Sequence, residues 1–166
     1  VARGTAHHKF LQYCNFEQAR ASLDTEIDRL LNDGKLTQEP ADMIDRKTLN
    51  EFLSTKLIDR IIASQLVMRE KRFTARLKPS EVFDEYKDVK TDATVIIHGA
   101  VDLAFVEDGK LVIVDYKTDR VKDITKLAGL YKKQLDLYKS AMEQSEELTV
   151  KECILCSIHL GAYIIV

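Results

Sequence analysis

The chain has 166 residues, which is the size of about one domain. Hydrophobic residues make up 45% and charged residues 31%, which excludes a mostly disordered chain, and the net charge of −2 gives no overall basic excess of the kind typical of nucleic-acid-binding proteins. No apolar run approaches the roughly 20 residues that span a bilayer. Because the chain has no initiator methionine or visible signal peptide and stops within an apolar run, we expect a single-domain piece of a longer protein.

The first 65 residues are predicted to be helical. Apolar residues recur at three- and four-residue steps between positions 6 and 31, which predicts one amphipathic helix that ends near Gly34. Thr37 is a candidate N-cap for a second helix with Pro40 in its first turn, and Ser54 is a candidate cap for a third. We therefore expect residues 1–65 to form an N-terminal helical part.

From residue 66 onward, the pattern becomes that of strands. Strands are predicted over 66–75, 93–106, 111–116, 150–157 and 162–166, with a weaker candidate at 81–86 and a helix over 126–143. The Asp108-Gly109 dipeptide between two apolar runs predicts a tight hairpin. This order predicts an α/β fold in which residues 66–166 form a core with a mixed central sheet flanked by helices.

The hairpin register brings two acidic residues together. A two-residue turn at 108–109 places Asp102 opposite Asp115, and both lie in otherwise apolar stretches. Opposed side chains have Cβ atoms about 4.5–5.5 Å apart, where two carboxylates repel by about 3 kcal/mol at an effective dielectric of ~20. A shared proton, a neutralising lysine or a divalent cation would compensate for this repulsion.

Lys117 lies two residues after Asp115 and therefore points to the same face of the strand. One lysine cannot balance two carboxylates and also explain their separation, so the pattern favours a metal together with the lysine. A structural Asp–Lys–Asp ion network and an acid/base aspartate pair stay open as alternatives. A register slip of one residue would move the two aspartates to opposite faces and remove the argument.

Four short motifs occur in a fixed order along the chain. They are Gly4-Thr-x-x-His8, Gly99-x-x-Asp102, Asp115-Tyr116-Lys117-Thr and Gln134-x-x-x-Tyr138. This set resembles the RecB-family nucleases of the PD-(D/E)xK superfamily, and the flanking residues resemble the C-terminal nuclease domain of AddA or RexA helicase–nuclease subunits. The resemblance runs from Arg3 to Val166 and implies a restriction-endonuclease-like fold.

A metal site is the first implication of this resemblance. Asp102 and Asp115 would bind the catalytic Mg²⁺, for which Mn²⁺ is an alternative, and the backbone carbonyl of Tyr116 would be a further ligand. His8 would complete the site, whereas His7 does not fit the spacing after the motif glycine. These four residues are the expected metal ligands.

Further site roles follow from the same resemblance. Lys117 would orient or activate the attacking water and stabilise developing charge. Gln134 and Tyr138 share a helix face and would position the DNA strand or the other site residues, although ordinary helix packing is the simpler alternative. Glu70, on an earlier strand, is a candidate supporting partner of the site.

As a whole, the resemblance implies a Mg²⁺-dependent (exo)nuclease domain that cuts single-stranded DNA during double-strand-break repair and recombination in the bacterial cytoplasm. It also implies helicase domains in the parent chain and an AddB- or RexB-type partner subunit. No G-x-x-x-x-G-K-[ST] motif is present, so this chain itself is not expected to hydrolyse ATP. The alternative is a catalytically silent nuclease fold that clamps DNA or docks to the helicase or partner.

For two remaining groups of residues, a purely structural role is the alternative to a functional one. A local basic cluster is expected to follow a DNA backbone, or else to keep a strand edge soluble: Arg69, Lys71, Arg72, Arg76 and Lys78, with Lys126, Lys132 and Lys133. The three cysteines, Cys14, Cys153 and Cys156, are an odd number, which favours free thiols in a reducing compartment. Cys153 and Cys156 face opposite sides of a predicted strand, so we expect buried thiols rather than a redox or zinc site.

Overall fold

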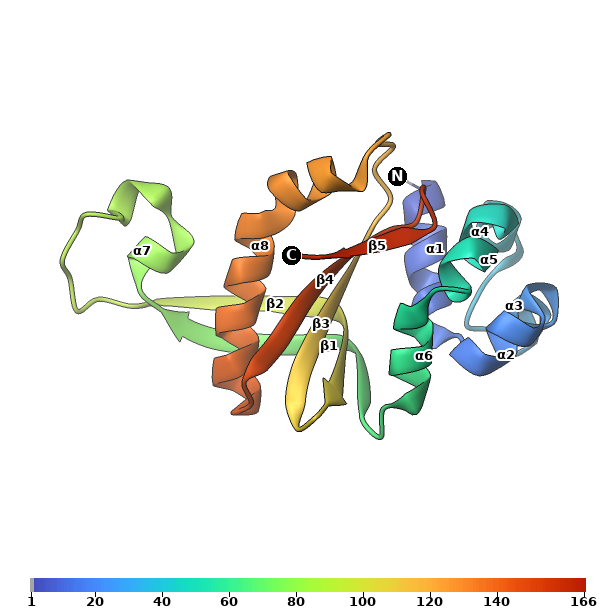
Figure 1. The fold of residues 1–166 in the computed structure, drawn as a ribbon, viewed down its shortest axis with the longest axis horizontal. Helices are drawn as coiled ribbons and strands as arrows, with labels where there is room; N and C mark the ends of the chain where they lie inside the picture. Colours follow the sequence, from blue (N-terminus) through green and yellow to red (C-terminus); the bar gives the residue numbers. More distant parts are fainter. Residues whose placement is uncertain (1) are drawn as a thin grey trace.

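The computed structural model describes residues 2–166 of the chain, with side chains from residue 5 onward. Val1 lies outside the described part, as do the side-chain surroundings of Arg3 and of Gly4, the glycine of the first predicted motif. A sheet separates two groups of helices (Figure 1). The helices are α1 (Ala2–Tyr13), α2 (Phe16–Ala21), α3 (Leu23–Asn32), α4 (Gln38–Asp42), α5 (Arg46–Leu53), α6 (Lys56–Ala63), α7 (Pro79–Val82) and α8 (Ile124–Glu146), with a 3₁₀ turn η1 (Asp84–Tyr86).

The sheet has five strands in the order of the sequence. They are β1 (Val67–Leu77), β2 (Val95–Glu107), β3 (Lys110–Lys117), β4 (Val150–Ser157) and β5 (Ala162–Ile165). Strands β3 and β4 are parallel and are connected through α8, whereas the other neighbours are antiparallel. The predicted α/β fold with a mixed central sheet is therefore confirmed.

The first predicted helix is wrong as a single element, because the chain forms three helices there. Asn15 ends the first segment and caps α2, since its side chain accepts a hydrogen bond from the Gln18 amide. Ser22 caps α3 by accepting from the Thr25 amide. All three helices bury apolar residues in one core, so the apolar periodicity continues across both breaks.

Two other local predictions are wrong, and a third, the Thr37 N-cap, is found at the predicted position. Residues 81–86 are not a strand, because Pro79 opens the short helix α7 and the Glu81 carboxylate accepts from the Lys78 amide at 2.8 Å. Ser54 ends α5, and Thr55 precedes α6 instead. Thr37 does occupy the N-cap position of α4, although its side chain makes no capping hydrogen bond.

Each face of the sheet has its own core. Helices α1–α6 pack on one face against alternate residues of β2, β3 and β4, including Phe105, Val114 and Cys156. Helix α8 packs on the other face against Val101, Ile113 and Leu155. Among the described helices, none is both long enough and apolar enough to cross a membrane.

Strands β1 and β2 change faces partway along their length. Leu103 of β2 packs with α1–α6, but Val101, only two residues earlier, packs with α8. The register on both sides of this change is continuous, and the residue between, Glu70 of β1, has a positive φ of 47°. The distal part of the pair, residues 71–101, therefore projects from the sheet as an arm with α7 at its end (Figure 1).

Candidate active site

The site lies where β2 and β3 separate. Their ladder pairs Glu107 with Lys110, as the predicted turn requires, and ends at Leu103↔Val114, one pair short of Asp102 and Asp115. The Tyr116 amide instead donates a hydrogen bond to Oδ2 of Asp102 over 2.7 Å. A carboxylate thus replaces a backbone carbonyl at this point.

His8 reaches the same point from α1. Its Nε2 donates to the carbonyl oxygen of Tyr116 over 2.9 Å and lies 3.5 Å from Oδ2 of Asp102. Three of the predicted metal-binding groups therefore converge: the imidazole, the carboxylate and the backbone carbonyl. His7 is buried instead, and its Nε2 accepts from the Asp45 amide at 3.1 Å, which gives it a structural role.

Asp115 is 4% exposed. By the alternation along β3 its side chain projects toward α8 rather than toward the Tyr116 ring and α1–α6, but the charges of Asp102 and His8 still act on its carboxyl. Nζ of Lys117 lies 2.8 Å from its Oδ2, but this oxygen has no hydrogen bond of acceptable geometry to any described residue. Burial raises the pKa of the Asp115 carboxyl, the Lys117 ammonium opposes that rise, and Asp102 adds to it. A buried, incompletely satisfied carboxylate of this kind is suited to a cation.

Helix α8 holds the ammonium of Lys117 from the other side. Lys117 donates to Oε1 of Gln134 at 2.9 Å, and Nε2 of Gln134 donates to the Tyr138 hydroxyl at 3.1 Å. The ammonium also lies 4.0 Å from the ring centroid of Tyr131. Sequence analysis did not assign Tyr131 to the site, although its spacing of three residues from Gln134 places it on the same helix face.

Tyr138 is itself supported by Phe73, a residue that the sequence analysis did not assign to the site. The ring of Phe73 packs edge-on to Tyr138, with ring centroids 5.7 Å apart. Phe73 in turn packs on Gly99, where a Cβ atom would lie 2.5 Å from the ring. The motif glycine thereby leaves room for the ring that supports Tyr138.

Glu70 lies across from Asp102 in the β1–β2 register, where regular pairing is interrupted. Partial desolvation and the nearby Asp102 raise the pKa of its carboxyl, and His8 opposes the rise. Glu70 is thus electrostatically coupled to the site.

The predicted basic cluster divides into structural and exposed residues. Arg69 turns inward, where it donates to the carbonyl oxygens of Leu11 and Gln12 and stacks over the Phe16 ring. Lys71 pairs with Glu146 at 3.1 Å. Lys132 and Lys133 are exposed and form ion pairs with Asp136 and Asp84, and Arg72, Arg76, Lys78 and Lys126 are exposed as well.

The three cysteines are free and buried. Cys153 belongs to the core under α8 and Cys156 to the core under α1–α6, as their opposite orientation on the strand predicts. Burial raises the pKa of the Cys14 thiol to about 12 and that of Cys153 to about 11.

The donor set suits a hard divalent cation. Carboxylate and carbonyl oxygens with one imidazole converge beside a buried carboxylate, and Mg²⁺ prefers few protein ligands together with waters and phosphate oxygens. Across the side chains of residues 5–166, no three His, Cys, Asp or Glu side chains lie close enough together to hold a metal ion by themselves. The converging donors of the described residues are the His8 imidazole, the Asp102 carboxylate and the Tyr116 carbonyl.

Comparison with known proteins identifies the class. The sequence profile of the PD-(D/E)XK nuclease superfamily matches residues 1–162, and the chain belongs to this superfamily. It is 29% identical over 166 residues to an ATP-dependent helicase/nuclease subunit from Clostridium acetobutylicum, covering 96% of this chain and 13% of that protein. Proteins of the same name from Clostridium botulinum strains 657 and Loch Maree are 31% and 32% identical over 165 residues, covering 98% of this chain.

The chain spans 13% of the length of these curated relatives. Among solved structures, that of SSO0001 covers 96% of this chain and 64% of its own, with 14% identity and a TM-score of 0.40.

Proposed function

We propose that this chain is the metal-dependent deoxyribonuclease domain of a bacterial cytoplasmic helicase–nuclease. It hydrolyses phosphodiester bonds of single-stranded DNA during double-strand-break repair and recombination. The observation that carries this proposal is the convergence of the His8 imidazole, the Asp102 carboxylate and the Tyr116 carbonyl beside the Asp115–Lys117 pair. Membership of the nuclease superfamily supports it.

In this proposal Asp102, Asp115, His8 and the Tyr116 carbonyl hold one Mg²⁺ or Mn²⁺ ion. The bound ion neutralises charge on the phosphate and lowers the pKa of a coordinated water. Nε2 of His8 donates its proton to the Tyr116 carbonyl in this structure, so it would hold the ion only in the other tautomer, with the ring proton on Nδ1 and the Nε2 lone pair free.

In this proposal Lys117 supplies the catalytic cation. Its ammonium is fixed between the Asp115 carboxylate and the Gln134 amide oxygen, over the Tyr131 ring. A charge fixed in this way needs no rearrangement when negative charge develops on the phosphate. Gln134 and Tyr138 act by holding that ammonium in place.

The remaining parts of the parent protein complete the activity. The helicase/nuclease relatives are far longer than this chain, and we assign to the missing part the helicase domains that deliver the strand. The proposed partner is of the AddB or RexB type. Within this chain, residues 1–166 form a single nuclease domain, with 1–65 supporting the 66–166 core.

Cleavage of labelled single-stranded DNA with Mg²⁺ or Mn²⁺ tests the proposal. The wild-type chain should cut, and Asp115→Ala and Lys117→Ala should each lose at least about 100-fold in rate. Lys47→Ala, which removes an exposed charge on α5, is the matched control and should cut like the wild type. Equal cleavage by all four proteins would reject the enzyme assignment, and DNA binding without any cleavage would favour the silent clamping or docking module.

A further inference from the structure

One face of the arm is left open by the helices. In β1, Phe73, Ala75 and Leu77 are buried against α8, so the alternate residues point away from it. We call the other side the open arm face: Arg72, Thr74 and Arg76 of β1, paired with Ala100, His98 and Ile96 of β2. All of these are exposed except Ala100, which is partly buried.

The two strands give this face two chemically different edges. Arg72 and Arg76 form a cationic edge along β1, and it contains no acidic residue. The β2 edge carries Ile96, which is 57% exposed, and the imidazole of His98. The Thr74 hydroxyl and Nδ1 of His98 are hydrogen-bonded at 2.9 Å, which fixes the orientation of the ring across the strands.

The open arm face leads directly to the candidate active site. Two residues beyond Arg72 and Ala100, the register reaches Glu70 and Asp102. At about 3.3 Å per residue, the track from Ile96 to Asp102 is about 20 Å long. Asp102 lies on the same pair of strands as the open arm face. A ligand bound along this face can therefore reach the Asp102 carboxylate by following β1 and β2 alone.

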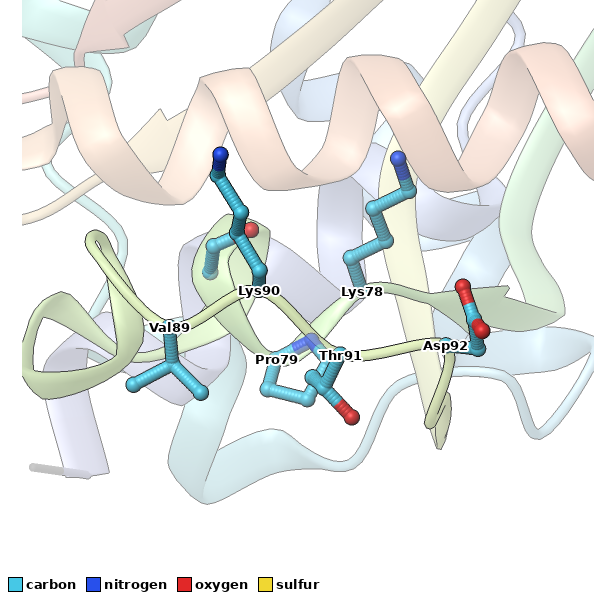
Figure 2. A pocket seen from close by; sticks show the side chains of 7 residues that line it. Lys78, Pro79, Val89, Lys90, Thr91 and Asp92 are labelled. Atoms are coloured by element: carbon cyan, nitrogen blue, oxygen red, sulfur yellow. The ribbon is translucent and has the colours of Figure 1, made fainter.

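The distal end adds two more cations. A pocket of about 430 Å³ lies at the end of the arm, and the two lysines share it with one carboxylate: it is lined by Lys78, Pro79, Ser80, Val89, Lys90, Thr91 and Asp92. Figure 2 shows the Lys78 and Lys90 side chains extending to one side of this pocket. Lys78 directly follows β1 and so extends the cationic edge by one position.

We propose that the open arm face binds the single-stranded DNA that enters the site, with phosphates along Arg72, Arg76 and Lys78 and bases over His98 and Ile96. The inference rests on the proposed function. An exposed cationic edge beside an exposed apolar and aromatic edge matches a single strand, whose phosphates and unstacked bases lie side by side. Duplex DNA fits less well, because its bases are turned inward. An acidic protein would pair with the cationic edge but would leave the apolar edge without a contact.

Fluorescence anisotropy with a labelled oligothymidylate, with EDTA in place of metal, tests this track. Arg72→Gln/Arg76→Gln should weaken binding about tenfold and reduce the salt slope of log Kd by about 1.4, since each single-strand phosphate contact contributes about 0.7. His98→Ala should weaken binding severalfold without changing the salt slope, because stacking is not ionic. Lys47→Gln/Lys56→Gln removes two exposed charges on α5 and α6 and should stay within about twofold of the wild type.

Equal affinity of the arm variants, the control and the wild type would overturn the inference, as would a wild-type chain that does not bind the oligonucleotide. So would arm variants that lose duplex or partner-protein binding while keeping single-strand binding. Thermal unfolding midpoints like that of the wild type show that the arm variants are folded. With Mg²⁺ present, most of the loss in kcat/KM should be in KM. If no protein cleaves, the proposed function fails while the anisotropy result still decides the binding track.

Discussion

The Asp102 carboxylate accepts a hydrogen bond from the Tyr116 amide at the point where β2 and β3 separate. This single contact satisfies a backbone donor that has lost its ladder partner and also fixes the carboxylate beside the Tyr116 carbonyl and His8. One side chain thereby links the end of the sheet to the candidate metal site.

Substitution of Asp102 should separate these two roles. Asp102→Asn and Asp102→Ala both remove the charge, so both should abolish metal-dependent cleavage. The asparagine retains an acceptor for the Tyr116 amide, and the alanine leaves that amide unpaired, so the alanine variant should be less stable by about 1–2 kcal/mol. Urea denaturation of the two variants measures this difference, and equal stability would show that the hydrogen bond contributes nothing.

A Tyr116 variant can show whether the metal site uses the backbone carbonyl of this residue or its side chain. Its hydroxyl is buried among α1–α6 and has no hydrogen-bond partner among the described residues. Tyr116→Phe removes an unsatisfied buried group, so the free energy of unfolding should rise by about 1 kcal/mol. Cleavage should be unchanged, because the proposed ligand is the backbone carbonyl. A loss of cleavage with normal stability would contradict that assignment.

Gly99 should tolerate no larger residue while Phe73 is present. A Cβ at Gly99 would lie 2.5 Å from the Phe73 ring, so Gly99→Ala should lower the free energy of unfolding by about 1–3 kcal/mol. It should also reduce cleavage, because the displaced ring supports Tyr138.

Two further variants complete this test by urea denaturation. Gly129→Ala is the control, since a Cβ there meets nothing within 4 Å on a helical surface, and it should be neutral or stabilising by up to about 1 kcal/mol. In a Phe73→Leu background the cost of Gly99→Ala should shrink. An unchanged cost in that background would show that the ring is not the obstacle.

Features set by residues adjacent in the sequence could be predicted, whereas features set by contacts between distant residues could not. The Asp108-Gly109 turn sets the hairpin register from two adjacent residues, so that register was predicted. The breaks at Asn15 and Ser22 were missed, because a shared core continues the apolar period across them. Phe73 meets Tyr138 only through the tertiary fold.

The change of face in β1 and β2 had no sequence signal. Glu70 has a positive φ, which residues other than glycine rarely adopt. Because the residue is neither glycine nor asparagine, the sequence gives no sign of this conformation. Regular alternation predicts one continuous face along β1, whereas the arm turns at this residue. Motif spacing favoured His8 over His7, and in the structure His8 contacts the Tyr116 carbonyl near Asp102, whereas His7 accepts from the Asp45 amide.

Acid should weaken one ion network far from the site. Arg60 donates two hydrogen bonds to the Glu107 carboxylate, and Lys151 adds a third at 2.8 Å. These cations lower the pKa of Glu107 from 4.5 to about 2. A lowered folded-state pKa contributes stability above pH 4.5 that is lost as the pH falls toward 2.

Glu107→Gln measures that contribution. At pH 7 the variant should be less stable by on the order of 1–2 kcal/mol, because the carboxylate is partly exposed and screened. The difference should shrink steadily between pH 4.5 and 2 in denaturation experiments. A difference that does not change with pH would contradict the assignment to this carboxylate.

In the proposed function, one divalent cation binds between His8, Asp102, Asp115 and the Tyr116 carbonyl. Anomalous scattering from crystals soaked in Mn²⁺ tests it most directly. We expect one strong peak about 2.0–2.3 Å from an oxygen of Asp102, an oxygen of Asp115, the Tyr116 carbonyl and Nε2 of His8, and no such peak in Asp102→Asn crystals. A peak elsewhere, or none at a Mn²⁺ concentration that supports cleavage, would contradict it.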